Sequence, residues 1–159
     1  AVAFRRVPRV MPPISLTYSF LPTIDKAHFM TIATFADLLQ EARKQPKPQR
    51  LLFVFVHAEL PDFPDADQRR RFEQGEGGVL VPVVCVDKST EELTSMAALV
   101  EESRRTEIEW DLVFTAAMDD PKDDAEVERQ LQRMMESLQM GNITTYLAFD
   151  HHGNALNVG

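Results

Sequence analysis

Apolar residues along the chain gather in short runs that alternate with segments of helical periodicity. The runs are rich in β-branched and aromatic residues and are too short for typical helices, which favours strands. They predict strands at 51–56, 79–86, 110–117, 143–149 and 155–158. Pro82 falls inside the second run and has no backbone N–H to donate. That strand therefore needs an edge position, a strand start or a bulge at Pro82.

Between these runs, apolar residues recur at every third or fourth position and so share one face of a helix. The pattern predicts helices at 35–42, at 67–74, from Ser89 to about 105, and from about 124 to 138. Thr34 and Asp65 are the expected N-caps of the first two helices. Ser89 and Glu92 have the spacing of a capping box, so the third helix is expected to start directly after the second strand.

Helices that alternate with strands predict an α/β fold in which most strands are parallel and the helices pack on the sheet. We expect a single domain with a four- to five-stranded, mostly parallel or mixed sheet and about four helices. The order of the strands within the sheet stays open.

Residues 1–29 differ from the rest of the chain in composition. They hold several prolines and no helical period, and their four basic residues against one acid give a charge of +3, whereas the whole chain carries −8. We expect this segment to be a leader or an expression extension that is not part of the fold. Residues 30–159 are then the single α/β domain.

Composition limits the class of protein. A chain of 159 residues with 44% hydrophobic content can bury a sizeable core. Its negative charge argues against a nucleic-acid or anionic-membrane surface, and no run approaches the roughly 18 apolar residues of a membrane span. Cys85 is the single cysteine, which excludes an intramolecular disulfide and a multi-cysteine metal site. These features predict a cytoplasmic protein.

Polar residues of the types that bind ligands or catalyse reactions follow several predicted strands. In a parallel sheet such residues meet at one edge, where open α/β sheets bind ligands. The candidate ligand-binding residues are His57, Glu59, Asp87, Lys88, Asp150 and His151. Their carboxylates and imidazoles suit a metal or acid–base site. Polar loops at strand ends are also expected simply because they face water, and Asp150 to Gly153 has the residues of a tight turn.

No motif with a defined chemistry is present in the sequence. It contains no zinc-binding spacing, nucleophile elbow, catalytic triad, dinucleotide fingerprint or kinase signature. Cys85 lies in an apolar strand, where a small buried thiol is expected. The three arginines at 69–71 suit a solvated helix face, or a contact with an anion or a partner. The sequence thus predicts no catalytic residue, no metal and no cofactor.

Several segments carry a resemblance to a known family. They are TFADLLQEAR (34–43), QRLLFVF (49–55), AELPD (58–62), RFEQGEGG (71–78), VPVVCVDK (81–88), ESRR (102–105) and LAFDHHG (147–153). Through them the chain from Met30 onward resembles a family of small, uncharacterised proteobacterial proteins often named "ribonucleotide reductase subunit alpha". The resemblance implies a bacterial protein associated with that enzyme as a regulator. A catalytic subunit needs several cysteines, and this chain has only Cys85.

The function expected from these observations is that of a non-catalytic α/β domain that binds a protein partner or forms a homo-oligomer. One alternative is a small-molecule or metal-dependent enzyme that uses the strand-end acids and histidines. The other is a ribonucleotide-reductase-associated regulator, which rests on the family name. Neither a nucleic acid nor a membrane is expected as a partner.

Overall fold

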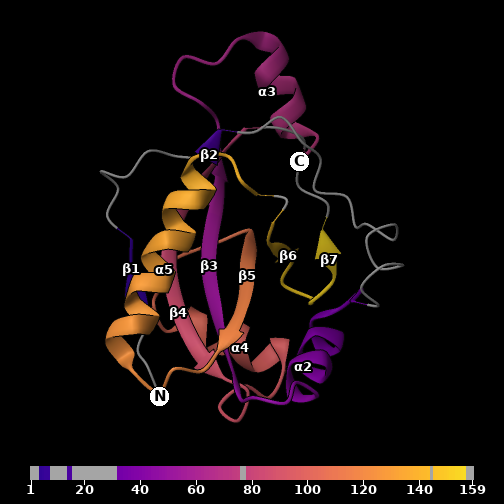
Figure 1. Ribbon diagram of the computed structural model, residues 1–159. Coiled ribbons are helices and arrows are strands. Elements are labelled where there is room, and N and C mark those ends of the chain that lie inside the picture. Colours follow the sequence, from indigo (N-terminus) through magenta and orange to yellow (C-terminus); the bar gives the residue numbers. More distant parts are fainter. Residues whose placement is uncertain (1–3, 8–13, 16–31, 76–77, 144, 157–159) are drawn as a thin grey trace.

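The computed structural model describes residues 4–7, 14–15, 32–75, 78–143 and 145–156. In this part of the chain, seven strands form one sheet in the order β1-β4-β3-β5-β6-β7, and β2 also pairs with β4 (Figure 1). The strands are β1 (Arg5–Arg6), β2 (Ile14–Ser15), β3 (Gln49–Glu59), β4 (Val79–Ser89), β5 (Leu112–Asp119), β6 (Leu147–Phe149) and β7 (Ala155–Leu156).

The strand directions differ from the prediction. The expected α/β class is confirmed, but every described strand pair is antiparallel, whereas a mostly parallel or mixed sheet was predicted. A helix between two strands suits a parallel crossover, yet it can equally return the chain beside a strand of opposite direction. The sheet also exceeds the expected four to five strands, because β1 and β2 join it from the segment before residue 30. Residues 157–158 of the predicted last strand lie outside the described residues.

Helices cover both faces of this sheet. The helices of the described residues are α2 (Phe35–Arg43), α3 (Ala66–Glu73), α4 (Met96–Arg104) and α5 (Asp124–Gln139), and all but α3 pack on the sheet. The helix α5 lies on one face, and α2 and α4 lie on the other (Figure 1). No helix in the described part of the chain has the length and apolar character needed to cross a membrane.

The strand β3 is buried on both of its faces. Its even-numbered residues from 52 to 56 join the core beneath α5, and its odd-numbered residues from 51 to 55 join the core beneath α2 and α4. None of these side chains is more than 4% exposed. Side chains alternate across a strand, so a run that is apolar at every position needs a layer on each side. The prediction of a central strand at 51–56 is therefore confirmed.

The first two helices begin at their predicted N-caps. Thr34 Oγ1 accepts a hydrogen bond from Asp37 N at 3.2 Å, and Asp37 Oδ2 accepts one from Thr34 N at 3.1 Å. Asp65 and Gln68 form the same reciprocal pair before α3. Each pair satisfies backbone donors that the first turn of a helix leaves unpaired.

The third helix begins later than predicted. Glu92 N donates to Ser89 Oγ at 3.2 Å, and Ser89 N donates to Glu92 Oε1 at 3.0 Å, so the predicted hydrogen bonds exist. They close a turn and do not start a helix, because β4 continues as far as Ser89, which pairs with Arg50 of β3. The helix α4 starts at Met96, with Ser95 as its N-cap.

A bulge accommodates the proline in β4. The register of β4 against β3 shifts between Phe55 and Val56, and Val83 is the extra residue. The carbonyl of Val83 accepts a hydrogen bond from Val7 N at 2.9 Å. A bulge was one of the three positions predicted for Pro82, and the bulge at Val83 confirms that prediction.

Two short segments before residue 30 pair with the outer edge of β4. The strand β1 stands opposite residues 84–85, and β2 stands opposite residues 79–80. Val7 is buried in the core beneath α5. This pairing differs from the expectation that residues 1–29 are not part of the fold. The rest of that segment, residues 1–3 and 8–13 and 16–29, lies outside the described residues.

The connection between β3 and β4 forms an arm at 60–78 that stands away from the body of the domain (Figure 1). It contains α3, which buries none of its residues. Phe63 is 100% exposed and has a φ of 52°. At the base of the arm, the Phe72 ring lies against Gly78. A Cβ at Gly78 would stand 2.8 Å from the carbonyl oxygen of Glu59 and 3.0 Å from that ring.

Replacing Gly78 by alanine is expected to destabilise the fold more than replacing Gly75. Both glycines have a positive φ, 100° and 78°, so both variants strain the backbone, by about 1–3 kcal/mol. The methyl group at 78 would also press on the Glu59 carbonyl, whereas at 75 nothing lies within 4 Å. Thermal unfolding of the two variants tests this difference. Equal melting temperatures would contradict the close packing at the base of the arm.

Candidate functional site

The antiparallel sheet divides the predicted site residues between its two ends. On β3, His57 stands opposite Val81 of β4, and Leu52 stands opposite Asp87. Five residues of extended strand separate these positions, which is about 17 Å. Metal–ligand bonds are only about 2 Å long. Asp87 and Lys88 therefore cannot share a ligand's contact shell with His57, and the predicted gathering of all six residues is wrong.

At one end of the sheet, His57 forms a close pair with Asp111. The His57 Nδ1 atom lies 2.8 Å from Asp111 Oδ2. The same oxygen accepts a hydrogen bond from Ala58 N at 2.6 Å, and Asp111 N donates to the Val56 carbonyl at 2.8 Å. The approach of His57 Nδ1 to Asp111 is a close contact without hydrogen-bond geometry, since the buried Nδ1 atom has no hydrogen-bond partner among the described residues.

His151 packs on Trp110 beside this pair. The two rings are stacked, with centroids 3.8 Å apart and planes 16° apart, and His151 Nε2 lies 2.6 Å from the Trp110 carbonyl oxygen. The indole Nε1 donates to Ser103 Oγ at 2.9 Å, and that hydroxyl donates to the Val100 carbonyl at 2.6 Å. The residue Ser103 is 2% exposed, and its hydroxyl already forms both of these hydrogen bonds. The hydroxyl is therefore not available as a nucleophile that a nearby imidazole could deprotonate.

Asp150 forms the turn that the sequence suggested. Its Oδ1 accepts hydrogen bonds from His152 N at 2.8 Å and Asn154 N at 3.0 Å. Gly153 has a φ of 81°, and its N donates to the Asp150 carbonyl at 3.1 Å. The alternative reading of this segment as a tight turn is confirmed. The turn also places Asp150 in the lining of a hollow that Asp111 lines as well.

Two hollows meet at the His57–Asp111 pair. The first, of about 320 Å³, is lined by Arg104, Trp110 and His151 among others. The second, of about 560 Å³, is lined by His57, Ala58, Phe72, Gly75, Asp111, Asp150 and Leu156. Both volumes fall in the range of small-molecule pockets. We call the second hollow the arm pocket, because Phe72 and Gly75 belong to the arm.

Four of the six predicted residues thus lie at this end of the sheet, and three of them line the two hollows. His57 lines both hollows, His151 lines the first and Asp150 lines the arm pocket. Glu59 stands two residues beyond His57 on β3, opposite Val79. Asp111 was not predicted, because it falls within an apolar run assigned to a strand. Its charge between Trp110 and Leu112 is the signal that marks it in the sequence.

At the opposite end of the sheet, Asp87 is a buried structural charge. It is 1% exposed, and it accepts hydrogen bonds from Arg50 at 2.9 Å and from Arg5 at 3.3 Å. Arg50 also contacts Asp120 at 3.2 Å. Burial by itself would lower the pKa of Arg50, but the hydrogen bonds and charges of Asp120 and Asp87 outweigh it and raise the pKa above its ordinary value.

Lys88 points to the other face of the sheet and has its own partners. Its Nζ lies 2.7 Å from Glu102 Oε2 of α4, and 5.9 Å from the centroid of the Phe4 ring. The side chain is 3% exposed. Buried charges are found paired because an unpaired one is expensive to remove from water. The contacts of Asp87 and Lys88 therefore explain both residues through the fold, without a ligand.

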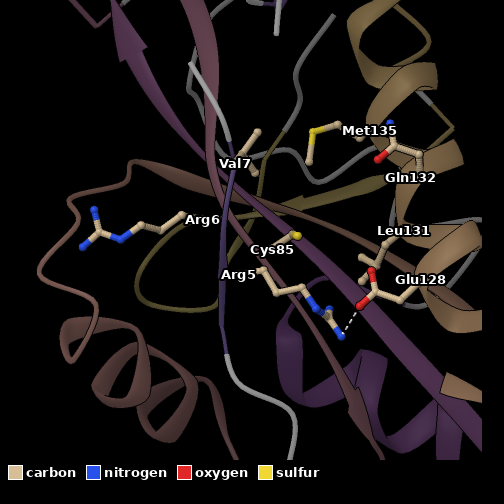
Figure 2. A pocket seen from close by; sticks show the side chains of 8 residues that line it. All are labelled: Arg5, Arg6, Val7, Cys85, Glu128, Leu131, Gln132 and Met135. Carbon is tan, nitrogen blue, oxygen red and sulfur yellow. Dashed lines mark ion pairs between the residues drawn. The ribbon is translucent and has the colours of Figure 1, made fainter. Parts of the chain in front are cut away.

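Cys85 lines a small hollow of about 170 Å³ between β1 and α5 (Figure 2). Arg5 points into this space and contacts Glu128 of α5 at 2.6 Å, whereas Arg6 points away from it (Figure 2). Burial raises the pKa of the Cys85 thiol, and the positive charge of Arg5 offsets this only in part. Because the thiolate is the reactive form, this environment suits the buried, unreactive thiol that the sequence predicts.

Neither the metal-binding side chains of the described residues nor the comparison with known proteins identifies a ligand. Within the described residues, no group of three or more histidine, cysteine, aspartate or glutamate side chains is arranged to hold a metal ion. Comparison of the chain with protein-family models, with curated proteins and with solved structures finds no match. The resemblance to the ribonucleotide reductase-named family therefore stays a prediction.

Replacing Asp87 by asparagine is expected to lower the free energy of unfolding by about 3 kcal/mol, because Arg50 and Arg5 lose a buried counter-charge. The matched control is Asp119→Asn at the same end of the sheet. The Asp119 side chain is 64% exposed and lies 4.0 Å from Lys47. Its Oδ1 accepts a hydrogen bond from Gln49 Nε2 at 2.8 Å. The asparagine amide oxygen can accept the same bond, so this variant should stay within about 0.5 kcal/mol of the parent. Urea unfolding measures both values. Two equally stable variants would contradict the structural role of Asp87.

Proposed function

We propose that the chain is a non-catalytic α/β domain that binds a protein partner through the arm at 60–78. The supporting observation is that Phe63 is 100% exposed on a connection whose helix buries no residue. The arm therefore gains little stability from the domain core. Long connections of this kind in compact domains are typically functional, and loops held by a rigid scaffold are common binding elements.

The charge of the arm defines the kind of partner. Of its three consecutive arginines, Arg70 and Arg71 pair with Asp67 on the same helix. Arg69 makes no ion pair within the described residues and is exposed. Arginine and aromatic side chains are enriched at the centres of protein interfaces. Phe63 and Arg69 would thus form the contact, and the partner would present an apolar pocket next to an acidic group.

The His57–Asp111 pair favours a second candidate function, that of a proton-transfer enzyme. In this candidate the His57 imidazole, with the Asp111 carboxylate 2.8 Å from its Nδ1 atom, is the general base. This candidate needs a bound substrate to supply the proton, because the nearby Ser103 hydroxyl is already engaged. The remaining alternative, a regulator of ribonucleotide reductase, rests on the family resemblance alone.

The first proposal is tested with a photoreactive phenylalanine analogue placed at position 63 in cells that express the chain naturally. We expect one discrete adduct, either with a second protein or with a second copy of the chain. The same analogue at Met140, which is 81% exposed on another part of the surface, serves as the positional control. It should give no such adduct.

A charge reversal at Arg69 completes this test. Arg69→Glu should abolish the adduct at position 63, whereas Arg133→Glu, at an exposed position of α5, should leave it unchanged. Circular dichroism establishes that both variants are folded. Adducts of equal yield at positions 63 and 140, or an adduct that survives Arg69→Glu, would refute the proposal.

A further inference from the structure

We propose that the arm pocket binds a small organic cation, an amine attached to a compact apolar body. The inference is independent of the protein-docking role of the arm, because it concerns the inner wall of the arm and not its exposed tip. It rests on three properties of the hollow: its acceptor atoms, the absence of basic side chains other than His57 from its described lining, and its apolar walls.

Two carboxylates of the pocket lining have acceptor capacity to spare. Asp111 Oδ2 accepts a hydrogen bond from Ala58 N and lies 2.8 Å from His57 Nδ1. Asp150 Oδ1 likewise accepts hydrogen bonds from two backbone N–H groups of its own turn. In each carboxylate, the other oxygen has no hydrogen bond to the described residues. The pocket therefore offers carboxylate oxygens to which an ammonium group, with three donors, can hydrogen-bond.

The described lining holds two carboxylates and no lysine or arginine. An anionic ligand would therefore meet like charge at Asp111 and Asp150 with no fixed cation to offset it. The net charge of −8 acts in the same direction over a longer distance and attracts cations toward the surface. Arg104 lines the neighbouring hollow and not this one. The charges thus favour a cation over an anion of the same size.

The pocket lining also includes apolar residues. Ala58 and Leu156 come from the sheet, and Phe72 comes from the arm. Gly78 keeps Phe72 in place, because only a residue without a side chain lets the arm come this close to the Glu59 carbonyl. The volume of about 560 Å³ suits a ligand with one ring or a short branched chain.

The test uses three probes that differ mainly in their polar group: 2-phenylethylamine, 2-phenylethanol and phenylacetate. Each is titrated into the full chain and followed by NMR at the backbone amides of Ala58 and Leu156. We expect saturable shifts for the amine, with an affinity at least about tenfold higher than for the alcohol, because a hydrogen bond between charged groups exceeds a neutral one by about that factor. Phenylacetate should bind no more tightly than the alcohol.

Variants separate the contributions of the carboxylates and of the apolar lining to binding. Asp111→Asn should lower the affinity for the amine by about tenfold and leave the affinity for the alcohol nearly unchanged, since the substitution removes a charge. Phe72→Ala should weaken the amine and the alcohol to the same degree, and it should fold normally because α3 buries no residue. Asp119→Asn, at the far end of the sheet, is the control and should change nothing.

Three results would overturn the inference. The first is an alcohol or a carboxylate that binds as tightly as the amine. The second is an amine that binds equally well to Asp111→Asn and to the parent chain. The third is the absence of saturable shifts at Ala58 and Leu156 with millimolar amine, measured on protein whose spectrum shows a folded chain.

Discussion

The burial of β3 on both faces, between two neighbours of opposite direction, is the constraint on which the rest of the structure depends. Its apolar side chains support two separate cores, one beneath α5 and one beneath α2 and α4. Because β4 and β5 both run against β3, the end of β3 lies beside the starts of its neighbours. The direction of pairing, more than the identity of any single residue, decides which polar groups meet.

The two ends of the sheet use charge in different ways. Around Asp87, arginines and carboxylates pair with one another, and these contacts join β1, β3 and the segment after β5. Around His57 and Asp111, the polar groups are partly exposed and border hollows. The charges around Asp87 are paired with one another and leave little capacity to bind a ligand. The carboxylates at the arm pocket each have an oxygen without a hydrogen bond to the described residues, and these oxygens can bind one.

Much of the local structure could be predicted from particular residues. The uninterrupted run at 51–56 marked the strand with a core on each side, Pro82 marked an irregularity that proved to be a bulge, and Thr34 and Asp65 marked helix starts. These features depend on residues that are near in sequence. Ser89 and Glu92 show the limit of such reasoning, because their hydrogen bonds form as expected and yet close a turn.

The candidate site was harder to predict, because it depends on strand direction. Alternating helices and strands were read as parallel crossovers, which placed Asp87 beside His57. The antiparallel register separates them and brings Asp111, from the start of β5, to the imidazole instead. Local periodicity does not encode the direction in which a distant strand returns. Asp111 could be recognised only by asking why a charge interrupts an apolar run.

The segments at the beginning of the chain have a consequence for solubility. In the described residues, only β1 and β2, of two residues each, shield the outer edge of the eleven-residue strand β4. Arg5 anchors this cover to both β4 and α5. If proteolysis removed it, backbone groups along β4 would become free to join a strand from another molecule, and only Pro82 and the bulge at Val83 would resist that joining. Protection against intermolecular sheet growth thus belongs to the segment up to Ser15 and not to the well-packed interior.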